Sequence, residues 1–290
     1  MVRVLITNAY SAENRGDGAI VLGMLRSLRR AFGPGAVEIT VSSADHPADA
    51  GFYPVPVVPS FHSLAARVSR RGAVQGVYFL AVLLPLSILG ALLVRATGRV
   101  PPLPAGLGRL LRAYARADLV VAAGGGYLYT TSPRRGAVML LVHLHSFMLA
   151  TLLGTPVHLY AQSVGPLASS LHLRLARAAL RRVRIIELRE AWSAALVEPW
   201  NLPVPVHRVA DAAFLLEPAA PDPDPLPPRR HALRIGLTVR RWFRDIVLQE
   251  RYEAAVAGCL RELAARHDLE AIFLPQVTVA ARGDDDRDTA

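Results

Sequence analysis

The sequence predicts an α/β fold in which helices cover both faces of parallel sheets. Two observations carry this prediction. Short apolar runs alternate with helical stretches over the first two-thirds of the chain, and two of these runs end in polar or glycine-rich turns. The expected strands are residues 2–7, 37–42, 119–123, 157–162 and 185–188. Such sheets are Rossmann-like, and they bind ligands beyond the carboxyl ends of the strands, where the strand order reverses.

The first turn, Asn14-Arg-Gly-Asp17, follows the strand at 2–7. We expect a helix to begin near Asp17, because its carboxylate can cap free backbone N–H groups and leucines then recur at helical spacing. Gly16 can adopt a positive φ and lets a ligand approach the backbone. The alternative for Asp17 is that it serves only as a helix cap.

The second turn is a run of three glycines that follows the strand at 119–123. Gly124, Gly125 and Gly126 can offer backbone N–H groups to an anion, or they can simply form a tight turn. Since the carboxyl ends of parallel strands meet at one edge of a sheet, both turns are expected to face one cleft.

The chain is expected to contain two domains, residues 1–216 and 231–290, joined by a proline-rich linker at 217–230. The second domain should contain a strand at 234–239, a helix from about 248 to 266 and a strand at 270–274. One such βαβ unit cannot bury both faces of its sheet. We therefore expect the second domain to be incomplete and the chain to be truncated.

All 33 basic residues are arginine and the formal net charge is +10. The absence of lysine excludes a Schiff-base lysine, a pyridoxal-phosphate anchor and a P-loop lysine. Anion binding must then depend on arginine and backbone N–H groups. The arginines are scattered over apolar helices without interleaved aromatic residues, which argues against nucleic acid as a partner.

Residues 77–94 form an uncharged segment of 18 residues between groups of arginines, long enough for a membrane span. A span here would place the two ligand-binding turns on opposite sides of a membrane. We expect a buried or interfacial helix instead, and peripheral contact with a membrane.

The single cysteine, Cys259, excludes an intrachain disulfide, and it is expected on an amphipathic helix with its side chain in the protein core. No signal peptide is expected, so the predicted location is the cytoplasm, either free or at the inner face of the cell membrane. His143 and His145 are two residues apart on a helix expected at 136–153 and so lie on different faces. They should be buried core residues, and no metal site is expected.

Taken together, the motifs resemble the polysaccharide pyruvyl transferase family. The segments that carry the resemblance are Asn14-Arg-Gly-Asp17, Gly124-Gly-Gly126-Tyr-Leu, Ala161-Gln-Ser-Val-Gly-Pro166, and Leu274-Pro-Gln276 followed by Asp284-Asp-Asp286. They occur in the order expected for that family, over nearly the whole chain. The resemblance implies a GT-B-like fold of two Rossmann-like domains.

The resemblance also implies the reaction. A pyruvyl (carboxyethylidene) group is transferred from phosphoenolpyruvate to two hydroxyls of one sugar in a cell-surface or exopolysaccharide precursor, forming a cyclic ketal. Phosphoenolpyruvate is then a co-substrate, and no further cofactor is expected. Its phosphate and carboxylate call for arginines and helix N-termini, and proton transfer calls for a general acid and base.

Arg189, Arg240 and Arg15 are the candidates for binding the donor. Arg189 ends a strand and precedes Ser193 by four residues, which resembles the family's Arg-acid-x-x-Ser turn. Arg240 ends the first strand of the second domain. The alternative is a structural role for these arginines, capping helix ends or pairing with Glu190 or Asp245.

Asp17 and Asp211 are the candidate catalytic groups, with Asp211 at a third strand end as a possible general base. Asp211 could instead cap the turn that follows it. Asn14 and Asp17 are candidates to orient sugar hydroxyls. Gln162 could contact substrate or anchor a loop.

Two other functions remain open from the sequence. A GT-B glycosyltransferase would use a nucleotide sugar, and an inactive fragment would only bind a glycan or lipid. A dinucleotide-dependent oxidoreductase is disfavoured, because the first strand is not followed by Gly-x-Gly-x-x-Gly.

Overall fold

A computed structural model describes residues 1–33, 35–133, 135–218, 228, 230–243 and 245–289. The chain divides into two compact units. The first comprises Met1–Ala12 and Asp17–Leu216, and the second Glu13–Gly16 and Glu217–Ala290. Most of the proline-rich linker expected at 217–230 lies outside the described residues.

The elements up to residue 216 are, in chain order, β1 (Val2–Ala9), α1 (Arg15–Phe32), β2 (Val37–Ser43), α2 (His46–Asp49), β3 (Val57–Pro59), α3 (Phe61–Ala66), α4 (Gly72–Tyr78), the π-helical turn η1 (Phe79–Leu83), α5 (Leu84–Thr97), α6 (Ala105–Arg116), β4 (Leu119–Ala122), β5 (Gly125–Leu128), α7 (Arg135–Leu153), β6 (Val157–Val164), α8 (Ser170–Leu180), β7 (Ile185–Leu188), α9 (Ala191–Val197), the 3₁₀ helix η2 (Glu198–Trp200), β8 (Val206–Arg208) and the 3₁₀ helix η3 (Ala212–Leu215).

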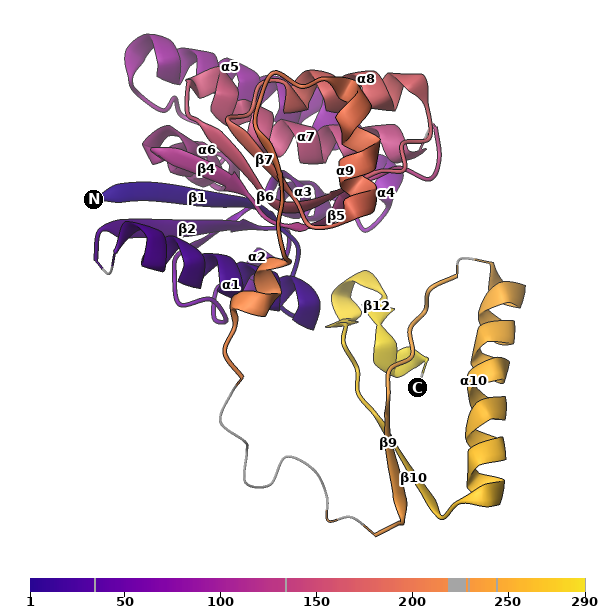
Figure 1. Cartoon of the computed structure of the whole chain (residues 1–290). Coiled ribbons are helices and arrows are strands. Elements are labelled where there is room, and N and C mark those ends of the chain that lie inside the picture. The colour runs from indigo at the N-terminus through magenta and orange to yellow at the C-terminus, as the bar shows by residue number, and fades with distance from the viewer. Residues whose placement is uncertain (34, 134, 219–227, 229, 244, 290) are drawn as a thin grey trace. The chain divides into compact units, whose positions relative to one another are not determined.

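The first unit is built on one parallel sheet with strand order β3-β2-β1-β4-β6-β7-β8, and β5 pairs with β6 (Figure 1). The chain moves outward from β1 to β3 and then crosses to the other side of β1 to form β4. The strand order therefore reverses between β1 and β4, where such sheets bind ligands. The predicted parallel α/β fold is confirmed.

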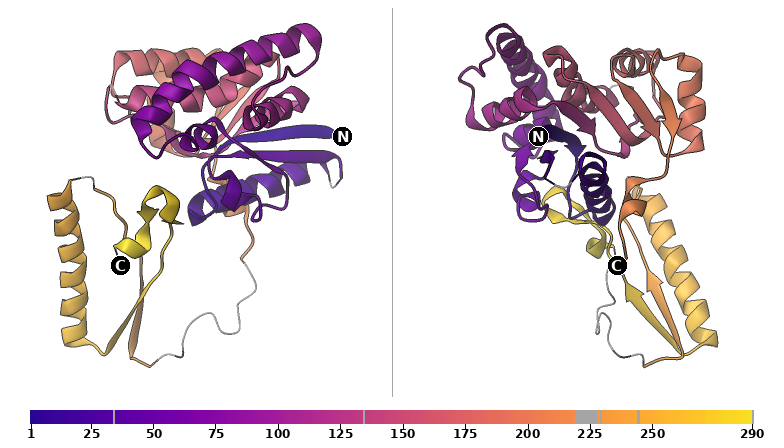
Figure 2. Two further views of the ribbon diagram at one scale, coloured as in Figure 1. Left: turned by 180° about the vertical axis from the view of Figure 1, so that it is seen from behind. Right: turned by 60° about the vertical axis from the view of Figure 1, so that its left-hand side comes forward.

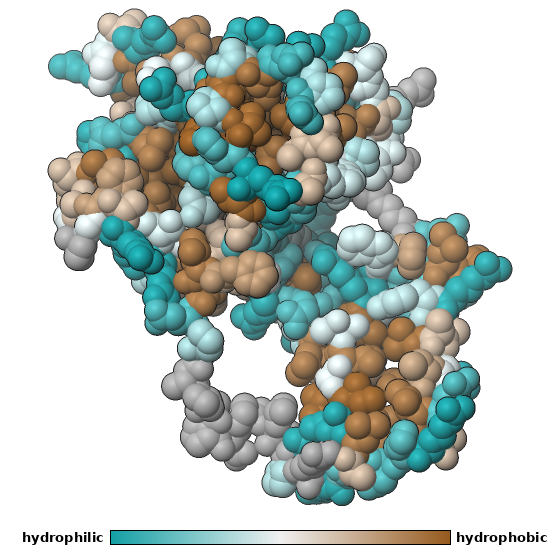
Figure 3. Space-filling model, viewed as in Figure 1, coloured by the Kyte–Doolittle hydropathy of each residue, from teal (hydrophilic) through white to brown (hydrophobic). Residues whose placement is uncertain are grey.

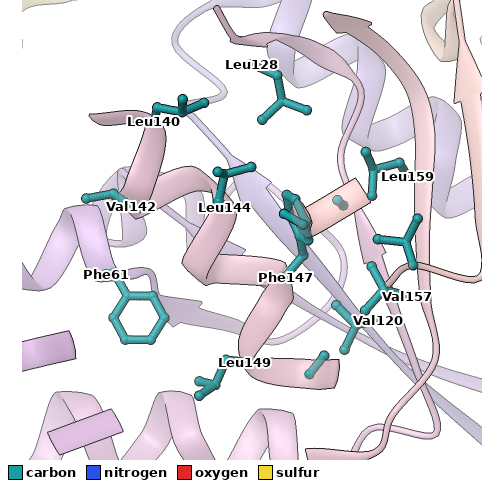
Figure 4. Packing of buried hydrophobic residues seen from close by; sticks show 14 of the residues in the cluster. Phe61, Val120, Leu128, Leu140, Val142, Leu144, Phe147, Leu149, Val157 and Leu159 are labelled. Carbon is teal, nitrogen blue, oxygen red and sulfur yellow. The ribbon is translucent and has the colours of Figure 1, made fainter. Parts of the chain in front are cut away.

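Alternating side chains of the strands fill two separate cores. Val120 and Leu159 belong to a core with α6 and α7, whereas Val121 packs with α1 on the other face. In Figure 4, Leu144 and Phe147 of α7 point toward the strand residues of the first of these cores. Burial on both faces explains why the strands read as continuous apolar runs.

Residues 72–97 form one continuous helical segment made of α4, η1 and α5, on the outside of the first unit (Figure 2, left). Pro85 lacks the N–H that would bond to the carbonyl of residue 81, and the helix widens to a π-turn just before it. Only 28% of its most apolar window is buried. The expectation of a buried helix is therefore wrong. An interfacial position remains a prediction.

Within the described residues, two helical stretches, Gly72–Thr97 and Gly136–Leu153, have the length and composition of a membrane span. The second of them lies in α7, and Leu140, Phe147 and Ala150 of this helix are fully buried against the sheet. Such a helix is part of a core, so its apolar composition needs no membrane to explain it.

The second unit contains β9 (Leu233–Leu237), α10 (Ile246–Arg266), β10 (Leu269–Phe273), β11 (Thr278–Val279), η4 (Ala280–Arg282), β12 (Asp284–Asp285) and η5 (Asp286–Asp288). The strands β9 and β10 pair in parallel, and β11 and β12 form an antiparallel pair. In Figure 3 apolar residues lie on the surface over β9, β10 and α10, as expected for a two-stranded sheet with one helix. Cys259 in α10 is exposed, so its expected place in a core is wrong.

Helix α1 and the 3₁₀ helix η3 approach so closely that only glycine fits at position 23. A Cβ atom on Gly23 would lie 2.0 Å from the Ala212 carbonyl oxygen, whereas one on Gly258 in α10 would meet nothing within 4 Å. We expect Gly23→Ala to lower the free energy of unfolding by about 1–3 kcal/mol. Gly258→Ala should raise it by up to about 1 kcal/mol, through helix propensity. Urea unfolding followed by circular dichroism measures both, and an unchanged Gly23→Ala protein would contradict the close approach.

Candidate active site

The carboxyl end of β1 is held against α7 by Asn8, which has a positive φ of 65°. Its Nδ2 donates to the His143 carbonyl oxygen at 3.2 Å and lies 3.4 Å from His143 Nδ1. Its Oδ1 is buried and has no hydrogen-bond partner among the described residues. Burial lowers the pKa of His143 to about 3, so this imidazole is neutral. Asn8 could not be predicted from the sequence, because its role depends on a backbone conformation.

The triple glycine does not form a simple loop. Gly125 begins β5, with φ of 135°, and pairs with Gln162 of β6. A Cβ atom on Gly124 would lie 2.8 Å from the Ala161 carbonyl oxygen, so a side chain is excluded there. A Cβ atom on Gly125 would lie 3.8 Å from Asp17 Oδ1, which places the Asp17 carboxylate close to this strand.

Asp17 is the third residue of α1, which begins at Arg15 and not at Asp17. The expected N-cap position of Asp17 is therefore wrong. Asn14 precedes the helix instead, and its Oδ1 accepts the N–H of Gly16 at 3.1 Å. Asp17 therefore lies in the first turn of α1, where the positive end of the helix dipole stabilises a carboxylate.

Gln162 is fully buried in β6. Its Nε2 donates to the Gly125 carbonyl oxygen and, at 3.2 Å, to the Ser163 carbonyl oxygen. It therefore anchors β5, as one of the two readings of this residue expected. Its Oε1 is buried and has no partner among the described residues, which leaves an acceptor at the ligand-binding edge of the sheet.

Arg189 directly follows β7 and lies at the centre of an ionic network. Its Nε donates to Ser163 Oγ at 2.7 Å and to Glu190 Oε1 at 2.9 Å, and its Nη1 donates to Asp211 Oδ2 at 2.5 Å. Ser193 Oγ donates to Glu190 Oε2 at 2.9 Å. Nη2 has no hydrogen-bond acceptor in the described part of the chain, so one edge of the guanidinium stays available for an anion.

Asp211 lies three residues beyond β8 and directly before η3, so it is not itself a strand end. Its Oδ1 accepts the N–H of Ala213 at 2.8 Å and caps η3, while Oδ2 accepts from Arg189. A base at this position would have to release one of these hydrogen bonds to take a proton. The role of Asp211 as a general base stays a prediction.

Glu190 supports Arg189 in its charged form. Burial alone would raise the pKa of the Glu190 carboxyl, but hydrogen bonds from Ser163 and Ser193 and the charge of Arg189 outweigh burial and lower it. The carboxylate therefore stabilises the fold above its unfolded pKa of about 4.5, and this contribution is lost as the pH falls through the folded pKa.

We expect Glu190→Gln to lower the melting temperature at pH 7 and the difference from the parent protein to shrink below about pH 4.5. Thermal unfolding by circular dichroism at several pH values measures this. Glu198→Gln, at a carboxylate outside the network, is the control. A difference that stays constant down to pH 3 would show that the network does not depend on the charge of Glu190.

The second unit holds the other candidates. Arg240 Nη2 donates to both carboxylate oxygens of Asp284, at 3.0 and 3.2 Å, and its guanidinium lies 5.8 Å from the Trp242 ring centre. The expected alternative partner, Asp245, instead caps α10 by accepting from the Val247 and Leu248 N–H groups. Asp245 is therefore the wrong partner, although Arg240 does form an ion pair, as the structural alternative predicted.

The Asn14 turn belongs to the second unit through its backbone. Asn14 forms a bridge with Val277, and the Arg15 N–H donates to the Gln276 carbonyl oxygen at 2.9 Å. Asp286 holds the same segment, since its Oδ2 accepts the N–H groups of Gln276 and Val277 at 3.0 and 2.8 Å. The Leu274-Pro-Gln276 segment is thus hydrogen-bonded to the Asp284-Asp-Asp286 segment.

The predicted residues fall into two sets. The first unit brings together Asp17, Gly124, Gly125, Gly126, Gln162, Arg189 and Asp211 along the carboxyl edge of the sheet, and the second unit holds Asn14, Arg15, Gly16 and Arg240. Within the described residues no group of three or more His, Cys, Asp or Glu side chains could hold a metal ion.

The sequence model of the polysaccharide pyruvyl transferase family matches residues 14–289. The chain belongs to the polysaccharide pyruvyl transferase family. No curated protein and no solved structure matches it significantly. The family is a class of transferases, and its name implies a polysaccharide as the acceptor.

Proposed function

We propose that this pyruvyl transferase family member uses phosphoenolpyruvate as donor and forms a cyclic ketal on two hydroxyls of one sugar, in a precursor of a cell-surface polysaccharide. The observation that carries the proposal is the Arg189 network. It presents a guanidinium at the carboxyl end of β7, oriented by Glu190 and Asp211, with Nη2 open to an anion.

The reaction needs no cofactor. One sugar hydroxyl adds to carbon 2 of the donor while carbon 3 takes up a proton, and the second hydroxyl then displaces phosphate from carbon 2. The products are the ketal and inorganic phosphate. Arg189 would hold the donor's carboxylate or phosphate, and Asp17 and Asp211 are our candidates for proton transfer.

The Gln162 amide and the glycines support the same role. Gln162 fixes the backbone of Gly125, Gly124 lets this segment pack closely on the Ala161 carbonyl of β6, and the absence of a side chain at Gly125 leaves room beside the Asp17 carboxylate.

Donor identity is the decisive test. Calorimetric titration of the full chain with phosphoenolpyruvate, and with a nucleotide sugar in parallel, should show saturable binding of phosphoenolpyruvate alone. Release of phosphate that depends on an added glycan acceptor would establish the transfer. Binding of the nucleotide sugar alone would favour a glycosyltransferase, and no binding by the folded chain would favour a glycan- or lipid-binding fragment.

A further inference from the structure

The helical segment Gly72–Thr97 has a continuous apolar face that nothing in the described first unit covers. Val77, Leu89 and Leu92 are 66%, 55% and 47% exposed. Further exposed residues of the same segment are Val74, Leu80, Ala81, Pro85, Ile88, Leu93 and Ala96. Successive exposed positions are one, three or four residues apart, so they form one stripe along the helix, and the stripe contains no acidic residue.

The opposite face of this segment is fastened to the protein. Phe79, Leu83 and Ala91 are buried in the main core, and Ser87 is hydrogen-bonded to His145 Nε2 at 2.8 Å. A Cβ atom on Gly90 would lie 2.7 Å from Leu111 Cδ2, so α5 packs closely on α6. Crossing a membrane would break all of these contacts. The segment can therefore lie on a membrane but not span it.

The charge around the stripe has one sign. Between residues 50 and 186 the sequence has fifteen arginines and one acidic residue, Asp118. Asp118 is itself paired with Arg3 at 3.0 Å. Arg70 and Arg71 precede the stripe, and Arg95 and Arg99 lie at its end, all exposed. This distribution matches an anionic surface and would repel a cationic one.

An open groove of about 560 Å³ adjoins the stripe between α5, α7 and the end of α8. Ile88, Met148 and Leu152 give it an apolar wall, and Arg95 and Arg182 also line it. The Arg95 guanidinium is held there by the Leu152 carbonyl oxygen at 3.0 Å. Apolar walls beside two guanidinium groups suit a molecule with a hydrocarbon chain and an anionic head.

We propose that the outer face of Gly72–Thr97 docks on an anionic phospholipid surface. The apolar stripe enters the region between headgroups and acyl chains, the flanking arginines bind headgroup phosphates, and the groove accommodates one lipid. The proposal does not depend on the donor or on the reaction.

Sedimentation of the full chain with vesicles tests the proposal. Vesicles of phosphatidylcholine with phosphatidylglycerol should carry the protein down, pure phosphatidylcholine vesicles should carry much less, and added salt should release it. The double variant Leu89→Ser with Leu92→Ser should lower the partition coefficient by about tenfold or more, because two exposed apolar side chains no longer enter the bilayer. The matched control is Ile246→Ser with Leu248→Ser, two exposed aliphatic residues of α10.

Charge is tested separately by Arg95→Gln with Arg99→Gln, which should reduce binding to anionic vesicles and weaken its salt dependence. Circular dichroism establishes that each variant is folded. The proposal is overturned if the folded parent protein does not bind anionic vesicles, or if the Leu89→Ser, Leu92→Ser protein binds as well as the parent. It is also overturned if the stripe is covered by a second copy, seen as a dimer that this variant converts to a monomer in the absence of lipid.

Discussion

Replacing Arg189 by alanine is expected to weaken phosphoenolpyruvate binding by about 30-fold or more, since losing one partner of a desolvated, hydrogen-bonded charge pair costs about 2–5 kcal/mol. The variant also leaves the carboxylates of Glu190 and Asp211 without their counter-ion. These negative charges would then repel an anionic donor from the place that Arg189 held. Calorimetric titration gives the dissociation constant.

Arg189→Lys separates charge from geometry. A lysine keeps the positive charge, but its single ammonium cannot reproduce the fork that reaches both Ser163 and Asp211. Donor affinity should therefore fall between those of the parent and the alanine variant. Arg30→Ala, at an exposed arginine in the last turn of α1, is the control. If Arg189→Ala is folded and binds phosphoenolpyruvate as the parent does, Arg189 has only a structural role.

Much of the fold could be predicted because strand periodicity and burial are local properties of the chain. Apolar runs at 2–7, 119–123, 157–162 and 185–188 became β1, β4, β6 and β7, with ends shifted by two residues at most. Parallel strands buried on both faces leave this signal, and their carboxyl ends then fix where Arg189 and Gln162 lie.

The partners of the charged residues could not be predicted in the same way. Glu190 adjoins Arg189 in sequence and was anticipated, whereas Asp211 is 22 residues away and Asp284 is 44 residues from Arg240. Which carboxylate meets an arginine depends on the tertiary fold, and an exposed or half-buried ion pair leaves no periodic pattern in the sequence. Asn8 was missed for a related reason, since its positive φ is a property of the folded backbone.

The helix at 72–97 shows a second limit. Hydropathy is the same for an apolar helix in a core, on a surface or in a membrane, so the sequence could not distinguish these cases. The structure does so by contacts: α7 has its apolar residues against the sheet, whereas α5 has one face buried and one exposed.

Mild acid is expected to destabilise the first unit through two histidines of α7, buried His145 and half-buried His143. Burial lowers the pKa of His143 to about 3 and that of His145 to about 4, from an ordinary value of 6.5. The unfolded chain takes up both protons below about pH 6.5, while the folded chain does not until the pH reaches the lowered values. The stabilising contribution is therefore complete above pH 6.5 and is lost as the pH falls.

Each histidine contributes a slope of up to about 1.4 kcal/mol per pH unit, so the free energy of unfolding should fall by up to about 3 kcal/mol per unit between pH 6 and 5. This window lies above the range in which carboxylates such as Glu190 titrate. Urea unfolding at pH values from 7.5 to 5 measures the slope.

Single variants assign the effect to its source. His145 contacts Ser87, Phe61 and Phe79, and Arg95 and Arg182 line the same groove. His143 contacts Asn8 and Tyr127, and the charge of His62 also lowers its pKa. His145→Gln retains a group that can bond to Ser87 but cannot be protonated, so it should remove about half of the slope. His207→Gln, at an exposed histidine of β8, should leave the slope unchanged. A parent slope near zero between pH 6 and 5 would mean that these imidazoles are protonated in the folded protein, and that water or an anion reaches α7 from the groove beside α5.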